Sequence, residues 1–282
     1  MRRRFASLPQ IGPAVSFYVL FFVVPLSIFF VYSFWTVNGF DIVPGFTLAN
    51  YVTGATSELY LAILVRTITV GLLTSCVVVP IAYVLAYLMR FVLETRARLL
   101  LDLVLVSMFS GYLVRIYAWR TILGKDGLMN SALLQLHLID QPITFLIYSQ
   151  WATVIVLVDL LIPLALLAVY SSMSNVSREH LEGARDLGSS RVHLHRTIVI
   201  PMILPGLNTA FAISFILAAG DYVVPSMVGG TQGVMVGNVV ADQFNGLGAN
   251  WPLGAALAYL VIGSVIAVYL ITSRVVRSAT RW

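Results

Sequence analysis

The sequence contains several long runs without a charged residue, and these runs limit what the chain can fold into. They include residues 5–40, 67–89, 141–158, 197–220 and 243–273. A helix needs about 20 mostly apolar residues to cross the roughly 30 Å hydrocarbon layer of a membrane. Residues of the set AVILMFWYC make up 59% of the chain and charged residues 10%, against about 45–50% and about 25% in ordinary globular domains. The pattern predicts a polytopic membrane protein and excludes a soluble enzyme, a disordered chain and a nucleic-acid-binding protein.

The apolar segments predict an all-α fold with six transmembrane helices. We expect the spans at about residues 12–35, 61–89, 99–122, 143–171, 199–225 and 253–273. A transmembrane β-barrel needs strands of about ten residues in which polar and apolar side chains alternate, whereas these segments are continuously apolar. The first segment follows three arginines, as a signal peptide would, but it is too long and lacks a small-residue cleavage site. We therefore expect an uncleaved first helix.

The basic residues predict the orientation of the chain in the membrane. Thirteen of the 17 Lys and Arg residues fall at the N-terminus, in 90–98, in 172–198 and at the C-terminus. Six spans place these four segments on one side, and cytoplasmic loops are enriched in Lys and Arg, so we expect both termini to be cytoplasmic. Seven acids lie in the outer half or near mid-membrane: Asp41, Glu58, Asp126, Asp140, Asp159, Asp221 and Asp242. A negative outer face favours the approach of cations, although the positive-inside asymmetry alone also accounts for it.

Residues 172–198 are too polar to span a membrane, but their pattern is helical. Ser177 can cap a helix whose first turn contains Glu179, where the helix dipole favours an acid. Gly188 can end that helix in the left-handed conformation. The next helix can be capped by Ser189 or Ser190. We expect a short helix, a sharp turn and a second helix that returns into the membrane.

The short helix of this loop has a narrow apolar stripe. Leu181, Ala184 and Leu187 recur every three residues, and we expect them to face the cytoplasm. An apolar stripe on a solvated loop favours a groove on a partner protein. A helix lying on the lipid surface is the alternative.

The same loop resembles the EAA loop of ABC-importer permeases. Glu182, Gly183 and Ala184 are followed after three residues by Gly188, and after nine more by the sequence Ile-Val-Ile-Pro at 198–201. The family pattern is E-A-A, three residues, G, nine residues and I-x-L-P. Two positions depart from it, because the family usually has Ala at the place of Gly183 and Leu at the place of the second Ile. A helical Gly costs up to about 1 kcal/mol relative to Ala.

Further segments resemble the permeases of spermidine/putrescine transporters. They are residues 112–119, 127–130, 220–230, 237–240 and 250–254. The chain is thus similar to a polyamine-type permease of the type I ABC-importer kind, one of two non-identical permease subunits in a bacterial inner (cytoplasmic) membrane. The resemblance implies one permease domain over residues 1–282, with its core at about 61–275 and the coupling loop at about 172–200.

The resemblance also implies the partners. The loop would dock on a dimer of ATP-binding subunits, and the coupling residues would be Glu182, Gly183, Ala184, Leu187 and Gly188. That ATPase would bind ATP and Mg, so we expect no cofactor in this chain and no enzymatic activity of its own. The other expected partners are a second homologous permease, an extracytoplasmic (periplasmic) substrate-binding protein and membrane lipid, with no nucleic acid.

Charged residues inside the spans point to a substrate path, because such residues usually face a cavity or each other. Arg115 and Asp159 lie at depths where they can form an ion pair, and lining a cavity is the alternative. Asp221 stands beside Tyr222 in a stretch that resembles the pore-lining segment of the family. A carboxylate beside aromatic rings suits an ammonium ligand, and we expect Asp221 and Asp159 to be the acids that interact with a cation. Further ring candidates are Tyr117, Trp119 and Trp251, although Tyr and Trp also anchor helices at membrane interfaces.

Two other classes of function are weaker. A stand-alone secondary transporter or channel often contains internal inverted repeats, and the chain has no convincing repeat. A membrane enzyme needs a catalytic constellation, and the sequence contains none. Within the importer class the permease sequence constrains the substrate weakly, so an opine, an aminophosphonate or an amino-acid-like solute is the alternative to a polyamine.

Overall fold

The computed structural model describes residues 8–39, 41–245 and 248–279. Their regular secondary structure is helical, as the all-α prediction requires, apart from one short antiparallel hairpin. The hairpin consists of β1 (Thr36–Asn38) and β2 (Asp41–Val43), and Val37 is paired with Ile42. The arginines at 2–4 and at 281, which entered the orientation prediction, lie outside the described residues.

The chain divides into two compact units. The first combines the described part of Met1–Ala62 with Val239–Gly263, and the second combines Ile63–Asn238 with the described part of Ser264–Trp282.

The first unit contains the N-terminal apolar helix. It consists of α1 (Leu8–Tyr18), the π-helical turn η2 (Val19–Val23) and α2 (Val24–Tyr32), and is followed by the hairpin and α3 (Ala49–Thr56). The side chains of residues 13–31 of this helix are exposed, as a helix surrounded by lipid requires. Within this unit the Tyr259 hydroxyl donates to the Leu26 carbonyl at 2.5 Å, and the rings of Phe29 and Phe244 meet edge to face at 5.6 Å.

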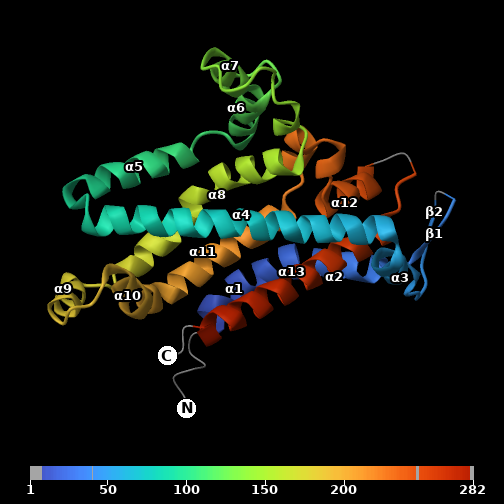
Figure 1. The fold of residues 1–282 in the computed structure, drawn as a ribbon. Helices are drawn as coiled ribbons and strands as arrows, with labels where there is room; N and C mark the ends of the chain where they lie inside the picture. The colour runs from blue at the N-terminus through green and yellow to red at the C-terminus, as the bar shows by residue number, and fades with distance from the viewer. Residues whose placement is uncertain (1–7, 40, 246–247, 280–282) are drawn as a thin grey trace. The chain divides into compact units, whose positions relative to one another are not determined.

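The second unit contains the remaining helices (Figure 1). They are α4 (Glu58–Phe91), η3 (Glu94–Arg96), α5 (Ala97–Met108), α6 (Tyr112–Leu123), α7 (Leu128–Gln135), η4 (Thr144–Leu146), α8 (Gln150–Met173), α9 (Arg178–Asp186), α10 (Arg191–Leu194), η5 (His195–Val199), α11 (Ile200–Gly220), η6 (Pro225–Gly229) and η7 (Thr231–Gly233). The helices α12 (Val236–Asn245) and α13 (Trp251–Ala279) contribute residues to both units, as does α4, whose residues 58–62 belong to the first unit.

The core of the second unit lies between α8, α11 and α4. Figure 1 shows α8 and α11 side by side, and small residues allow these helices to approach closely. A Cβ atom at Gly206 of α11 would lie 2.3 Å from the Cβ atom of Ser172 on α8. A Cβ atom at Gly71 of α4 would lie 3.0 Å from the ring of Phe215. Helices in membranes associate through such close approaches of small residues.

Within the described residues, five helices are long and apolar enough to cross a membrane. They are Gly12–Tyr32, Glu58–Phe91, Gln150–Met173, Arg191–Gly220 and Trp251–Val275. A bent pair, α5 with α6–α7, adds a sixth candidate span, and its two parts meet at 93°. The described residues thus contain five candidate spans, or the predicted six if the bent pair is one span.

Three predicted boundaries are wrong. The third span, expected as one helix over 99–122, is broken after Met108, because Ser110 and Gly111 do not continue the helix. The fourth begins at Gln150 rather than 143, since the Ser149 side chain caps it by accepting from the Ala152 N–H at 3.1 Å. The fifth ends at Gly220 rather than 225.

Candidate functional site

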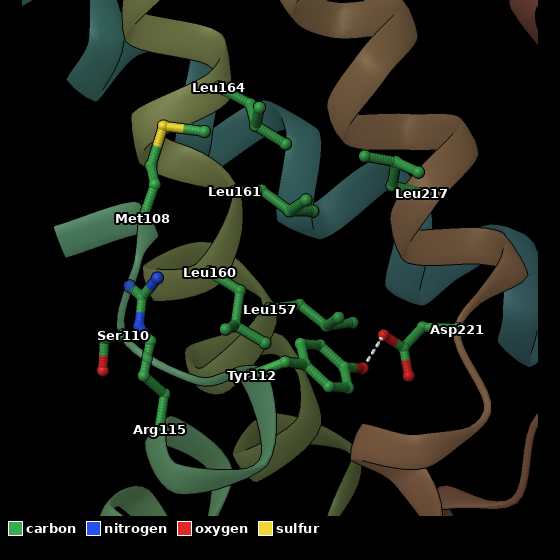
Figure 2. A pocket seen from close by; sticks show the side chains of 10 residues that line it. All are labelled: Met108, Ser110, Tyr112, Arg115, Leu157, Leu160, Leu161, Leu164, Leu217 and Asp221. Atoms are coloured by element: carbon green, nitrogen blue, oxygen red, sulfur yellow. Dashed lines mark hydrogen bonds between the residues drawn. The ribbon is translucent and has the colours of Figure 1, made fainter. Parts of the chain in front are cut away.

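A cavity of about 330 Å³ lies where the bent third span meets α8 and the end of α11 (Figure 2). Its apolar wall consists of four leucines of α8, together with Leu217 and Met108. Its polar side chains come from the bend and from the end of α11, and they are Ser110, Tyr112, Arg115 and Asp221. A concave apolar site with a few convergent polar groups is typical of a small-molecule path.

Asp221 provides the negative charge of this cavity. It is the C-terminal cap of α11 and has extended backbone angles. One carboxylate oxygen accepts a hydrogen bond from the Val224 N–H at 2.9 Å, and the other accepts one from the Tyr112 hydroxyl (Figure 2). Within the described residues no Lys, Arg or His forms an ion pair with Asp221. The carboxyl group is thus fixed by neutral donors, and no described cation occupies it.

Arg115 and Asp159 form an ion pair, which is one of the two arrangements that the sequence analysis considered for them. Nη2 of Arg115 lies 2.8 Å from Oδ2 of Asp159, and Nε lies 3.2 Å from the same oxygen. The Trp119 indole N–H also donates to this oxygen at 3.0 Å, since residues four apart share one face of α6. Arg115 lines the cavity as well, whereas Asp159 is not one of its lining residues.

Two predicted aromatic residues lie elsewhere. Tyr117 is 54% exposed and does not line the cavity. It is two residues away from both Arg115 and Trp119, and residues two apart on a helix point to different faces. Tyr222 also does not line it, and its carbonyl accepts from the Asn238 side chain at 2.7 Å. The sequence reasoning missed Tyr112, whose signal was its place directly after Gly111 within the polyamine-permease-like segment.

The loop at 172–200 has the predicted helix boundaries. The Ser177 hydroxyl accepts from the His180 N–H at 3.4 Å, and the His180 ring accepts from the Ser177 N–H at 3.3 Å, which together form a capping box. Gly188 has a φ of 77°. The Ser189 N–H donates to the Ala184 carbonyl at 3.0 Å and the Gly188 N–H to the Arg185 carbonyl at 2.8 Å, which is a Schellman motif. Ser190 caps α10.

The predicted apolar stripe of this loop is only partly exposed. Leu187 is 89% exposed, but Leu181 is 4% exposed and belongs to the core of the unit. The stripe prediction is wrong for Leu181, which lies with Tyr87 and Phe91 of α4 around a small space, whereas Leu187 is the C-cap of α9 and lies beyond its last helical residue. Glu182, Gly183 and Gly188 are exposed. A hollow of about 620 Å³ lies beside them and is lined by Ala184, Leu187, Gly188, Ser190, His193 and Thr197, among others.

The comparisons with known proteins identify the family. Residues 3–281 match the model of the "Binding-protein-dependent transport system inner membrane component" family. The chain is 32% identical, over 232 residues, to the spermidine/putrescine transport system permease protein PotB of Escherichia coli K12, which covers 81% of this chain and 83% of that protein. It is 29% identical over 245 residues to PotB of Haemophilus influenzae, covering 86% and 84% of the two chains.

The fold matches that of a solved importer. The crystal structure of a bacterial ABC transporter involved in the import of alginate aligns with a TM-score of 0.78 at 15% identity, covering 99% of this chain and 98% of that chain. This likeness confirms the predicted type I permease fold. Members of the family are membrane components rather than enzymes, so the prediction of a transport subunit without catalytic activity is also confirmed. The chain belongs to the binding-protein-dependent transport system inner membrane components, and it is a multi-pass permease subunit of an ABC importer that resembles the polyamine permeases.

Proposed function

We propose that this permease forms the path by which putrescine, spermidine or a related small amine crosses the bacterial inner membrane. The observation that carries the proposal is Asp221, a carboxylate without a cationic partner among the described residues, at the edge of a largely apolar cavity. An ammonium group can pair with this carboxylate while its aliphatic chain lies along the leucines of α8. The relationship to PotB, a spermidine/putrescine permease protein, supports the same class of substrate.

Within this proposal Asp221 contacts the amine, the Tyr112 hydroxyl holds the carboxylate until the amine replaces it, and the other residues support them. Arg115, Asp159 and Trp119 form a hydrogen-bonded cluster that fixes α6 against α8. Tyr222 holds the segment after Asp221 through the Asn238 side chain. Tyr117 lies outside the cavity and is assigned to the surface of the span.

The energy for transport comes from partners. We propose that a dimer of ATP-binding subunits, which binds ATP and Mg, docks on Glu182, Gly183, Ala184, Leu187 and Gly188. Exposure of the loop beside a hollow of about 620 Å³ supports this assignment. A second homologous permease and an extracytoplasmic substrate-binding protein complete the importer, and this chain acts as one permease domain with both termini cytoplasmic. The concentration of Lys and Arg in the segments on the loop side supports that orientation.

A second class of substrate is favoured by one observation. Arg115 lines the same cavity as Asp221, and a solute with both an amine and an anionic group could contact both. This arrangement suits an opine, an aminophosphonate or an amino-acid-like solute. The ion pair with Asp159 occupies two of the guanidinium nitrogens of Arg115. Arg115 is therefore less available to an anionic group of the solute, and the polyamine remains the preferred substrate.

The test is the ATPase activity of the complete transporter reconstituted in lipid with its substrate-binding protein. Putrescine, spermidine, amino acids, an opine and an aminophosphonate are compared at saturating concentrations. Stimulation by a polyamine supports the proposal. Stimulation that only an amino acid, an opine or an aminophosphonate produces overturns the polyamine assignment and keeps the importer.

A further inference from the structure

The C-terminal part of α4 has an aromatic face. This face contacts η5, the turn that connects the coupling loop to α11. Tyr83, Tyr87 and Phe91 are spaced four residues apart and therefore share one side of the helix. The Tyr83 hydroxyl is hydrogen-bonded to Nδ1 of His195. The Tyr87 ring lies 4.8 Å from the His195 ring, centroid to centroid.

His195 stands at the point where the loop returns to the membrane. It opens the π-helical turn η5, which joins α10 to α11, and π-helical turns are frequent at functional sites. The preceding residue, Leu194, is buried. From α9, Leu181 and Glu182 lie with Tyr87 and Phe91 around a space of about 200 Å³. The aromatic face of α4 thus contacts η5 through His195 and lies beside α9 around this space.

Farther along α4, two polar side chains contact the segment that follows the cavity. Oγ1 of Thr67 accepts from the Val236 N–H at 2.9 Å, and Arg66 donates to the Val234 carbonyl at 3.3 Å. This segment is tied to the residue after Asp221, since the Asn238 side chain donates to the Tyr222 carbonyl at 2.7 Å. Thr67 and Tyr83 are about 24 Å apart along the helix at 1.5 Å per residue. One helix therefore contacts the loop near Tyr83 and the cavity's flanking segment near Thr67.

Pro80 provides a place where α4 can bend. It lies inside the helix, lacks the N–H that would bond to the carbonyl of Cys76, and is a usual site of helix kinks. The segment after Pro80 is packed in the core through Ala82, Ala86 and Met89. Its hydrogen bond to His195 links this segment to the end of the coupling loop as well.

We propose that Tyr83 is a positioning residue for transport, because its hydrogen bond to His195 makes the end of α4 follow the coupling loop. When the ATPase moves the loop, this hydrogen bond makes α4 move with it. The movement then extends along α4 to Thr67, which contacts the segment that follows the cavity. The inference rests on the proposed function, since it presumes that the loop is moved by an ATPase. It adds a residue that contacts neither the substrate nor the ATPase.

The test is Tyr83→Phe in the complete transporter reconstituted in lipid vesicles, with amine-loaded binding protein outside. Uptake of labelled putrescine and hydrolysis of ATP are measured in the same vesicles. We expect the complex to assemble, basal ATPase to stay at the wild-type level, and uptake per ATP hydrolysed to fall about fivefold, in keeping with the loss of one hydrogen bond. A purely structural role would lower the yield of complex and leave uptake per ATP unchanged.

Two controls make the result specific. Tyr87→Phe keeps its ring beside His195, and its hydroxyl has no described hydrogen bond, so uptake per ATP stays at the wild-type level. His195→Asn keeps an acceptor near the position of Nδ1 and retains more coupling than His195→Leu. If the Tyr83 variant does not assemble, this His195 pair decides the question, and equal coupling in the two variants overturns the inference.

The outcomes separate the two proposals. Wild-type uptake per ATP in Tyr83→Phe overturns the role of Tyr83 and leaves the importer intact. A wild-type complex whose ATPase does not respond to any loaded binding protein overturns the proposed function itself.

Discussion

The Tyr112 hydroxyl donates a hydrogen bond to the Asp221 carboxylate, which joins the first turn of α6 to the end of α11 across the cavity (Figure 2). The two residues are 109 positions apart in the chain. The second carboxylate oxygen is held by the Val224 N–H, so Tyr112 is the side chain that fixes the first. It also follows the break at Gly111, where the third span changes direction.

Tyr112 and an arriving ammonium group compete for the same oxygen of Asp221. Tyr112→Phe removes the competing donor, and we expect the complex to bind putrescine about fivefold more tightly, the equivalent of one net hydrogen bond. Equilibrium binding of labelled putrescine to the purified complex without binding protein measures the effect. Tyr117→Phe, on the same helix but outside the cavity, is the control and leaves binding unchanged. Weaker binding in Tyr112→Phe would instead make the hydroxyl a ligand of the amine.

The Arg115–Asp159 pair stabilises the contact between α6 and α8. Arg115→Met leaves a half-buried carboxylate without its cation, and we expect the free energy of unfolding to fall by about 1–3 kcal/mol. Thermal unfolding of the solubilised permease measures this loss. The double variant Arg115→Met with Asp159→Leu removes the unpaired charge and recovers part of the stability. A double variant less stable than the single one would contradict this account.

Gly188 is required at the turn after α9 because its φ is 77°. A β-branched side chain resists this conformation, so Gly188→Val distorts the turn between α9 and α10. We expect the ATPase subunits to be lost when the permease is purified by an affinity tag. Quantitative copurification is the measurement, and a full complement of ATPase in the variant would argue strongly against docking at this loop.

Gly183 provides the opposite case on the same helix. A Cβ atom there has nothing within 4 Å, and Ala is favoured over Gly in a helix by up to about 1 kcal/mol. Gly183→Ala is expected to stabilise α9 and to retain the ATPase, which makes it the matched control for Gly188→Val. Loss of the ATPase in Gly183→Ala would show that the ATPase requires a residue without a side chain at this position.

The local features of the fold were predictable from the sequence. Apolar runs gave the number of spans, and short-range chemistry gave the caps at Ser177, Gly188 and Ser190. These features depend on residues within one or two helical turns. The EAA-like spacing, together with the polyamine-permease segments, was enough to predict the family that the comparisons confirm.

The tertiary features were not predictable in the same way. The direction change at Gly111 depends on how α5 and α6 pack, and the sequence shows only a weak helix former there. The partnership of Tyr112 with Asp221 joins segments that are distant in the sequence. Leu181 and Leu187 have similar chemistry and the same spacing, yet one is buried and the other is exposed, because only one faces the end of α4.

The central claim is that Asp221 recognises the transported amine, and one measurement tests it most directly. Putrescine-stimulated ATPase and uptake are compared for the wild-type transporter, Asp221→Asn and Asp242→Asn, each reconstituted with saturating loaded binding protein. Replacing a carboxylate that binds an ammonium group costs about 1.5–3 kcal/mol, so we predict that Asp221→Asn lowers uptake by about 10- to 100-fold. Asp242, an exposed acid outside the cavity, serves as control and leaves uptake unchanged. Wild-type uptake by Asp221→Asn would contradict the account.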